Sequence, residues 1–157
     1  MFALFPSFTQ KFLEVNYIMI DRNDNPDYLN AFLDYSITIL NKSPNSIKEY
    51  NYDLAVFLKY IKLHFNMTDE KDYKNITIKD IDISTIKKIT IEDIHAYISH
   101  MATELQSKPS TRARKISSIR VFFNYLSQKA KLIEANPAQN LESPKLRQTY
   151  PKIFIFG

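Results

Sequence analysis

Apolar residues recur at the spacing of a helix in the first half of the chain. Over residues 26–41 they follow the three- and four-residue intervals that place side chains on one helix face. They are Leu29, Phe32, Leu33, Ile37 and Leu40. A second stripe begins behind Ser43 and Pro44, a capping residue followed by a residue type tolerated in a first turn. Its members are Ile47, Leu54, Phe57, Leu58 and Ile61. The two stripes predict helices over residues 26–41 and 44–65.

The second half of the chain carries two more helical patterns. Thr90 and Asp93 have the spacing of a capping box, which opens a predicted helix over residues 91–106. Its apolar positions are Ile94, Tyr97, Ile98, Met101 and Leu105. Ser107 and Pro109 then indicate a new helix that starts near residues 108–110 and continues to about residue 128. Its apolar side is formed by Ile116, Ile119, Phe123 and Leu126.

The isoleucines between the second and third predicted helices alternate with polar residues, as they would in a short strand. They are Ile76, Ile78, Ile81 and Ile83. No other stretch of the chain offers a convincing strand for pairing, so the pattern favours a connection with a short helical turn, and a small strand is the alternative. The expected fold is an all-α bundle of four helices. A fifth would be added if the loose stripe through Phe8, Phe12, Val15 and Met19 forms a helix rather than a frayed tail.

Composition excludes several classes of chemistry. The chain has no cysteine, which removes disulfides, thiol nucleophiles and cysteine-bound zinc and favours a reducing, intracellular setting. Its only glycine is the last residue, so Walker loops and dinucleotide-binding turns are disfavoured. The three histidines do not form a metal-binding motif, and no cofactor, metal or small-molecule ligand is predicted. No apolar run approaches the roughly 20 residues of a membrane span, which predicts a cytoplasmic protein without a membrane partner.

Tyrosines are frequent, and several lie within predicted helices beside the apolar stripes. They are Tyr50, Tyr52, Tyr60, Tyr97 and Tyr125. An aromatic ring in such a position usually packs on the core while its hydroxyl reaches water. The sequence therefore predicts a structural role for these five residues, with a nucleophile or a stacking platform as the weaker alternative.

Cations cluster at the start of the fourth predicted helix, in "STRARKISSIRVFFNYL". At 100° per residue, one side of this helix, distinct from the apolar side, gathers hydroxyls and cations. The residues on that side are Thr111, Arg114, Lys115 and Ser118. Such side chains can bond phosphate oxygens or guanine edges, and exposed amides at a helix start also favour anions. Arg112 lies near the edge of the apolar side, and Arg120 lies opposite the apolar side. Both are therefore weaker candidates for binding phosphates or bases.

The start of the second predicted helix repeats this chemistry in "NKSPNSIKEY". Its polar and basic residues are Lys42, Ser43, Asn45, Ser46 and Lys48. Two such helix starts could hold a phosphate backbone and enter a groove together. Each stretch alone is better explained by capping residues on a solvated face, and the net charge of +4 permits a nucleic-acid partner without requiring one.

Four segments in order resemble a known family. "SPNSIKEYNYDLAVFLKYI", "ITIEDIHAYISHM", "STRARKISSIRVFFNYL" and "NPAQNLESPK" resemble the N-terminal core-binding domain of tyrosine recombinases, the Xer-like and phage-integrase family, over about residues 26–151. The resemblance implies a SAM-like bundle of four to five helices that grips one face of a recombination half-site in double-stranded DNA beside other recombinase subunits. The implied DNA-binding residues are Lys42, Ser43, Asn45, Ser46, Lys48, Thr111, Arg112, Arg114, Lys115 and Ser118.

The same resemblance implies a division of the chain. Family members continue past a leucine-proline step, similar to Tyr150-Pro151 here, into a catalytic domain with arginines, a lysine, histidines and a tyrosine nucleophile. Only "KIFIFG" follows in this sequence, so no catalytic residues are predicted and the chain is not expected to be an enzyme. The expected parts are an extension over residues 1–25, a core-binding domain over 26–135 and a linker over 136–157.

A protein–protein interaction module is the alternative function. In that case the basic face would bind an acidic partner instead of DNA. The two functions predict different arrangements of charge, because a duplex favours cations from both helix starts on one concave surface, whereas scattered cations favour a protein partner.

Overall fold

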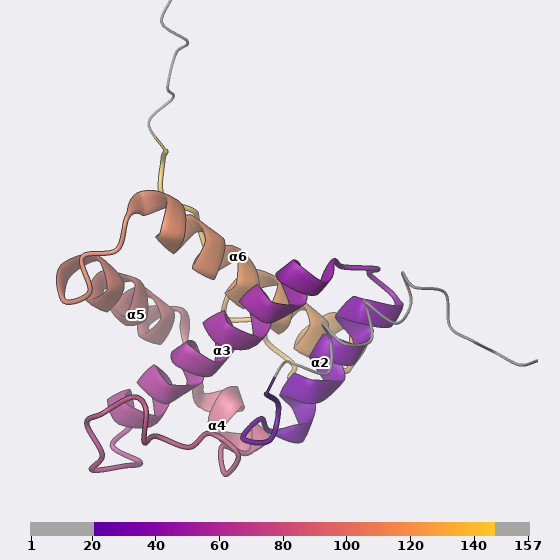
Figure 1. Ribbon diagram of the computed structural model, residues 1–157, viewed down its shortest axis with the longest axis horizontal. Helices are drawn as coiled ribbons and strands as arrows, with labels where there is room; N and C mark the ends of the chain where they lie inside the picture. The colour runs from indigo at the N-terminus through magenta and orange to yellow at the C-terminus, as the bar shows by residue number, and fades with distance from the viewer. Residues whose placement is uncertain (1–20, 147–157) are drawn as a thin grey trace, which may run out of the picture.

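The computed structural model describes residues 21–146, and every regular element in that range is helical. The elements are α2 (Asp27–Thr38), α3 (Pro44–His64), α4 (Ile83–Lys88), α5 (Ile91–Thr103) and α6 (Pro109–Asn124), followed by the π-helical turn η1 (Tyr125–Lys129) (Figure 1). The predicted all-α bundle is therefore confirmed. The possible helix through Phe8 and Met19 lies outside the described residues. No helix within residues 21–146 is long and apolar enough to cross a membrane.

The predicted caps account for where two of the helices begin. Ser43 accepts a hydrogen bond from the amide of Ser46 at the start of α3, with Pro44 in the first turn. Thr90 and Asp93 form the expected capping box at the start of α5, in which each side chain bonds the other residue's amide. These bonds satisfy amides that a helix start leaves without partners.

The helix ends show how the chain turns without internal glycine. Within residues 21–146 four residues have positive φ, and each lies shortly after a helix ends. They are Asn41, Asn66, Gln106 and Lys131, with φ between 47° and 55°. Glycine usually occupies this left-handed position, and asparagine is the next most common choice there. At the end of α2 the amide of Lys42 bonds the carbonyl of Ser36, a closure that stops this helix at Thr38 instead of the predicted residue 41.

Aromatic side chains from α2, α3, α5 and α6 form the centre of the core. The rings of Phe32 and Phe122 pack edge to face with centroids 5.5 Å apart, and those of Phe57 and Phe123 do so at 6.2 Å. All four are fully buried. Helix α3 packs against α2, α5 and α6, so it is the central helix of the bundle (Figure 1).

The connection before α4 is pinned to the bundle and contains no strand. Ile76, Ile78 and Ile81 are buried, and the Tyr28 hydroxyl donates a 2.8 Å hydrogen bond to the Ile81 carbonyl. The buried ammonium of Lys62 donates to the Thr77 carbonyl at 2.8 Å. The isoleucines alternate because the connection lies along the core with one side inward. The sequence interpretation as a connection with a short helical turn, here α4, is confirmed.

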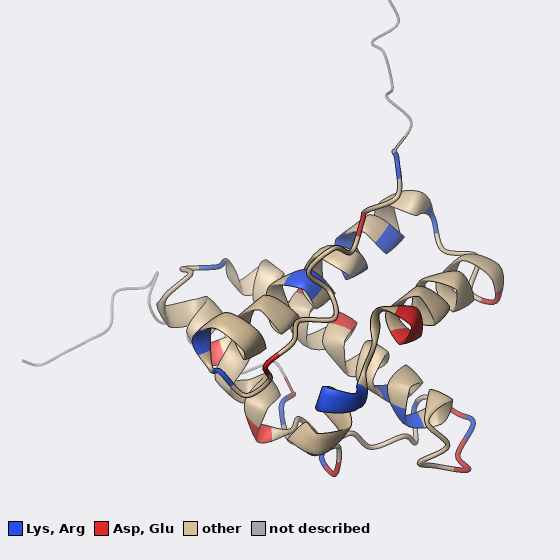
Figure 2. Cartoon of the chain, turned by 180° about the vertical axis from the view of Figure 1, so that it is seen from behind, with Lys and Arg blue, Asp and Glu red and all other residues tan. Residues whose placement is uncertain are grey.

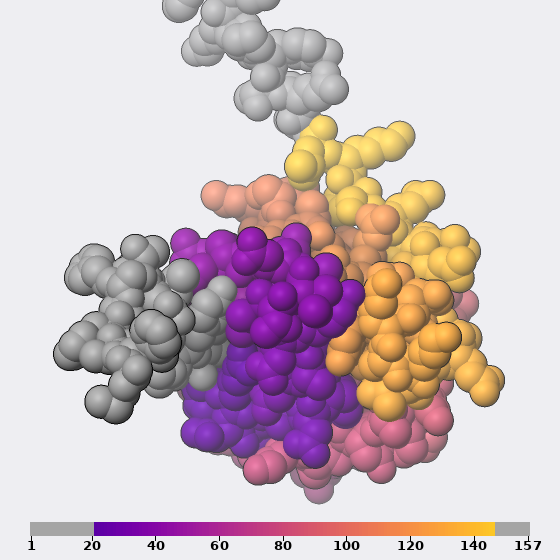
Figure 3. Space-filling model, turned by 90° about the vertical axis from the view of Figure 1, so that its right-hand side faces the viewer, coloured from indigo at the N-terminus to yellow at the C-terminus, as the bar shows by residue number. Residues whose placement is uncertain are grey.

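The segment after α6 continues the packed core. Figure 3 shows η1 and the residues that follow it, in orange, lying beside α2 in indigo. Ile133, Ala138 and Leu141 are buried in the same apolar cluster as the helices. Packing therefore reaches beyond residue 135, where the sequence placed the end of the core-binding domain.

Candidate nucleic-acid interface

Three of the predicted DNA-binding residues meet at one carboxylate, where the middle of α3 crosses the first half of α6. Asp53 accepts hydrogen bonds from Arg114 Nη1, at 2.8 Å to Oδ2 and 3.0 Å to Oδ1. The same carboxylate accepts from Lys115 Nζ at 3.1 Å and from the Ser118 hydroxyl at 2.9 Å. The Asp53 side chain is fully buried, so this group is an internal ion cluster that joins the two helices.

The cluster corrects the expected orientation of the basic side of α6. The helical wheel placed Arg114, Lys115 and Ser118 on a side free to bind DNA. In the structure the Arg114 side chain is 37% exposed, but that of Lys115 is only 11% exposed, and Ser118 is buried. The reason is that α6 packs against α3 on this side as well as against the core. Arg114 is the member of the cluster that reaches the surface.

The outermost face of α6 is polar and carries no negative charge. The exposed residues on this helix include Ser110, Ser117, Arg120 and Asn124, and its cations are Arg112, Arg114, Lys115 and Arg120. Figure 2 shows Lys and Arg along α6 and no Asp or Glu. Arg112 is held by its own helix start, because its guanidinium donates to the Ser107 carbonyl. Arg120 is exposed, as its place opposite the apolar stripe indicated, whereas Thr111 is half-buried.

The start of α3 divides into capping residues and exposed residues. Ser43 and Ser46 bond each other at the cap, as the simpler interpretation of this stretch predicted. Asn45 and Lys48 are exposed one turn apart on α3, and Lys42 is exposed just before the helix. Ser43 is exposed as well but bonds Ser46 at the cap, so Lys42, Asn45 and Lys48 are the exposed residues outside the cap that can meet a partner.

A shallow hollow joins the start of α3 to the second half of α6 and to the segment after η1. Its polar lining residues are Lys42, Ser117, Arg120, Asn124, Asn136 and Gln139. Helices α3 and α6 cross (Figure 1), and in this hollow the start of α3 lies beside the second half of α6. The concave surface consequently joins Lys42 with Arg120, while Arg114 and Lys115 lie near Asp53. Asp53 is 11 residues beyond Lys42, about 16 Å along a helix.

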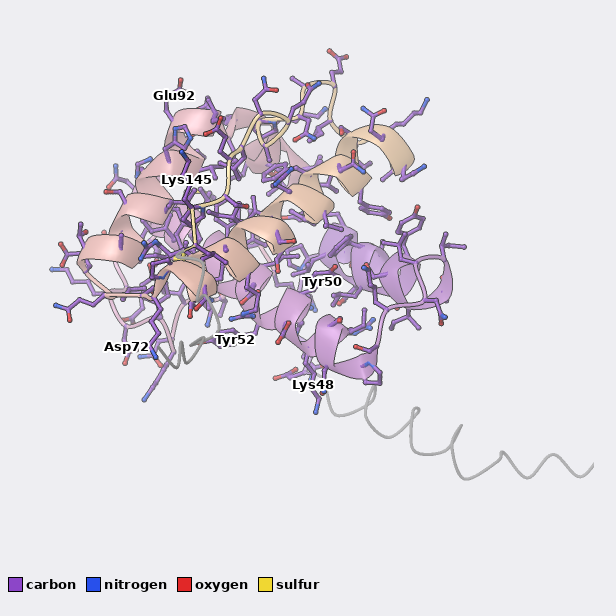
Figure 4. The ribbon with its side chains drawn as sticks, turned by 90° about the horizontal axis from the view of Figure 1, so that it is seen from above. Lys48, Tyr50, Tyr52, Asp72, Glu92 and Lys145 are labelled. Carbon is purple, nitrogen blue, oxygen red and sulfur yellow. The ribbon has the colours of Figure 1, made fainter. Side chains whose placement is uncertain are left out.

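Tyr52 is a surface residue that the sequence assigned to the core. It is 63% exposed, and the Lys115 ammonium lies 4.9 Å from the centre of its ring. Figure 4 shows Tyr52 and Lys48 on one side of α3 and Tyr50 on the other. Tyr50 instead packs against Phe32, with ring centroids 5.6 Å apart.

Two signals in the sequence pointed to these missed residues. Residues two apart on a helix differ by about 200° in direction, so Tyr50 and Tyr52 could not both face the core. Asp53 lies directly before Leu54 on the apolar side of its helix, and a buried carboxylate requires a cation from another segment. The charged side chains of α6 were the available partners.

A second polar cluster lies between α3 and α5. His64 Nε2 lies 3.0 Å from Asp93, and the rings of His64 and His100 both pack on Tyr60. Burial would raise the pKa of Asp93, but hydrogen bonds from Thr90 and His64 hold that pKa below its usual value. Asp93 also caps α5, so the cluster has a structural explanation. Among the described residues, no three His, Cys, Asp or Glu side chains are grouped to hold a metal ion.

Comparisons with known proteins place these features in a family context. A sequence model described as the phage integrase N-terminal SAM-like domain matches residues 28–131. The chain is 42% identical over 127 residues to the tyrosine recombinase XerC of Caldanaerobacter subterraneus subsp. tengcongensis. The matched region covers 80% of this chain and 36% of that protein. It is 30% identical over 123 residues to XerC of Leptospira interrogans, covering 78% of this chain and 33% of the relative.

Another relative is the tyrosine recombinase XerD of Listeria innocua, 30% identical over 127 residues, with 81% of this chain and 37% of the relative covered. The chain therefore spans about a third of the length of the curated relatives that it matches. No solved structure matches it significantly.

Proposed function

The chain belongs to the family of phage integrase N-terminal SAM-like domains, and from this premise we propose that it grips one half-site of a recombination site in duplex DNA. The curated relatives are tyrosine recombinases, which supports a role in recombination. The partners we propose are double-stranded DNA and other recombinase subunits on the same DNA. The predicted family and the SAM-like helical fold are confirmed.

The outer face of α6 is the observation that supports DNA binding most directly. Of the four cations of this helix, Arg120 is exposed and Arg114 reaches the surface; the helix has no acid, and its other exposed residues are small or hydrogen-bonding. A duplex offers phosphate oxygens along its backbone and acceptors on guanine in the major groove, both of which suit arginine. A helix with no negative charge can approach that surface without repulsion.

The predicted DNA-binding residues divide into contact and support groups. We propose that Arg114 and Thr111 from α6, with Lys42, Asn45 and Lys48 from the start of α3, contact the DNA. We add to these Tyr52 and Arg120 because both are exposed. Ser43 and Ser46 cap α3, Arg112 bonds the Ser107 carbonyl, and Lys115 and Ser118 bond Asp53. The support group would act on DNA only by shaping the contact group.

Replacing Arg114 with alanine should weaken duplex binding about tenfold, the equivalent of about 1.4 kcal/mol. If the guanidinium neutralises one phosphate, the slope of log affinity against log salt should become shallower by about 0.9. If it also reads a guanine edge, sequence preference should relax at that base pair. Fluorescence anisotropy with a selected half-site duplex, repeated over a range of salt concentrations, measures both quantities.

Lys71→Ala is the control for Arg114→Ala. Lys71 is an exposed cation in the connection between α3 and α4, on the part of the bundle away from α6 (Figure 1). This variant loses the same charge and should leave both the affinity and the salt slope close to wild type. Equal losses in the two variants would show that overall charge, and not the face of α6, governs binding. Failure of the wild-type chain to bind any duplex at low salt would count against the proposed function.

We further propose that this 157-residue chain holds DNA without cutting it. Cleavage by a tyrosine nucleophile requires arginines free to neutralise charge on the phosphate under attack. Tyr52 is exposed beside Lys115, but Lys115 is largely buried on the Asp53 carboxylate, and Arg114, which shares that carboxylate, supplies a single guanidinium where cleavage needs more than one. Incubation with supercoiled plasmid, followed by denaturing gels, should show neither nicked DNA nor a protein–DNA adduct. An adduct that Tyr52→Phe abolishes would contradict this prediction.

A further inference from the structure

Asp53 has an environment that is uncommon for an acid in a small helical bundle. Its carboxylate is fully buried and accepts four hydrogen bonds, from Arg114, Lys115 and Ser118. A buried ion pair adds little net stability compared with apolar packing, because both charges must leave water. Stability alone therefore gives a weak reason for an acid at this place.

The geometry connects this buried acid to the surface. Arg114 is 37% exposed, and both of its hydrogen bonds to Asp53 use one nitrogen, Nη1. A guanidinium is a planar fork with five N–H donors, so holding one corner fixes the direction of the others. An unrestrained arginine would have to give up rotamer freedom on binding, whereas this one is ordered beforehand.

We infer that Asp53 is a positioning residue for DNA binding: it holds Arg114 in the orientation in which the guanidinium meets the duplex. This inference rests on the proposed function. Asp53 itself lies too deep to touch DNA and acts through Arg114. The carboxylate also bonds a second cation, Lys115. The negative charge of Asp53 therefore keeps a partner when Arg114 engages a phosphate or a base.

The sign of the effect separates positioning from simple electrostatics. Asp53→Asn removes a negative charge from a face that meets a polyanion, so Coulomb attraction alone predicts tighter binding. Loss of positioning predicts weaker binding. Glu49→Gln is the matched control, because Glu49 is exposed one turn earlier on α3 and the variant has the same change in charge. We expect Glu49→Gln to bind duplex as well as or better than wild type.

The test is a cycle of Asp53→Asn, Arg114→Ala and the double variant, with affinity measured by anisotropy on one selected duplex. Asp53→Asn should weaken binding about fivefold in the wild-type background. It should cause no loss in the Arg114→Ala background, where there is no guanidinium to position. Circular dichroism and thermal unfolding of each variant establish that the folded protein is being compared.

A second variant covers the case in which Asp53→Asn fails to fold. Ser118→Ala removes one bond to the carboxylate without changing any charge, and it should weaken binding about twofold only when Arg114 is present. Tighter binding by folded Asp53→Asn, or an equal loss with and without Arg114, would overturn the inference. If wild type binds no duplex, the proposed function fails instead, so the two failures are distinguishable.

Discussion

Replacing Phe123 with alanine should lower the free energy of unfolding by about 3–5 kcal/mol, because the change removes a buried ring and leaves a cavity. Phe123 is fully buried, with the Phe57 ring centroid at 6.2 Å and the Phe122 centroid at 5.5 Å. It therefore joins α6 to α3 and fills the space beside its neighbour in the chain. Single domains have total stabilities of about 5–15 kcal/mol, so this loss is a large share.

Urea unfolding followed by circular dichroism measures this loss as a lower midpoint at an unchanged slope. Leu105→Ala is the control, because Leu105 is also apolar but is 54% exposed just after α5. A surface substitution of this kind should change stability by no more than about 0.5 kcal/mol. Similar midpoints for the two variants would contradict the packing of α6 against α3 described above.

The helices could be predicted because burial leaves its period in the sequence. The stripe from Ile47 to Ile61 follows the three-, four- and seven-residue spacing of one helix face, and these residues are buried in α3. Ser43 and Thr90 could be placed as caps because few residue types bond the free amides of a first turn. Alternating isoleucines were ambiguous, since a connection lying along a core buries every second side chain just as a strand does.

The candidate site was harder to predict because it depends on how two helices cross. A helical wheel gives the direction of Lys115 and Ser118, but it does not say that α3 occupies that direction. Asp53 looked like one acid among several in the sequence, and only its place beside Leu54 indicated burial. The two basic helix starts were expected to act together. The two helices cross instead, so that Lys42 lies with Arg120 and Arg114 lies with Asp53.

The crossing of these helices changes what a substitution at Lys115 should do. An exposed cation contributes little to folding, so the wheel alone predicted that Lys115→Ala would affect DNA binding without affecting stability. In the structure the Lys115 side chain is 11% exposed, bonds Asp53 at 3.1 Å and lies over Tyr52. Removing one partner of a buried ion pair costs about 3–5 kcal/mol when the other charge is left alone.

Lys115→Ala should therefore destabilise the fold by about 2–3 kcal/mol. The loss is smaller than for a carboxylate left without any partner, because Arg114 and Ser118 still bond Asp53. Lys48→Ala, which removes an exposed cation from α3, should change stability by no more than about 0.5 kcal/mol. Urea unfolding of Lys115→Ala, Asp53→Asn and the double variant measures the coupling, which should be about 0.5–3 kcal/mol for residues in one network. Additive losses, or a Lys115→Ala variant as stable as Lys48→Ala, would mean that Lys115 does not support Asp53.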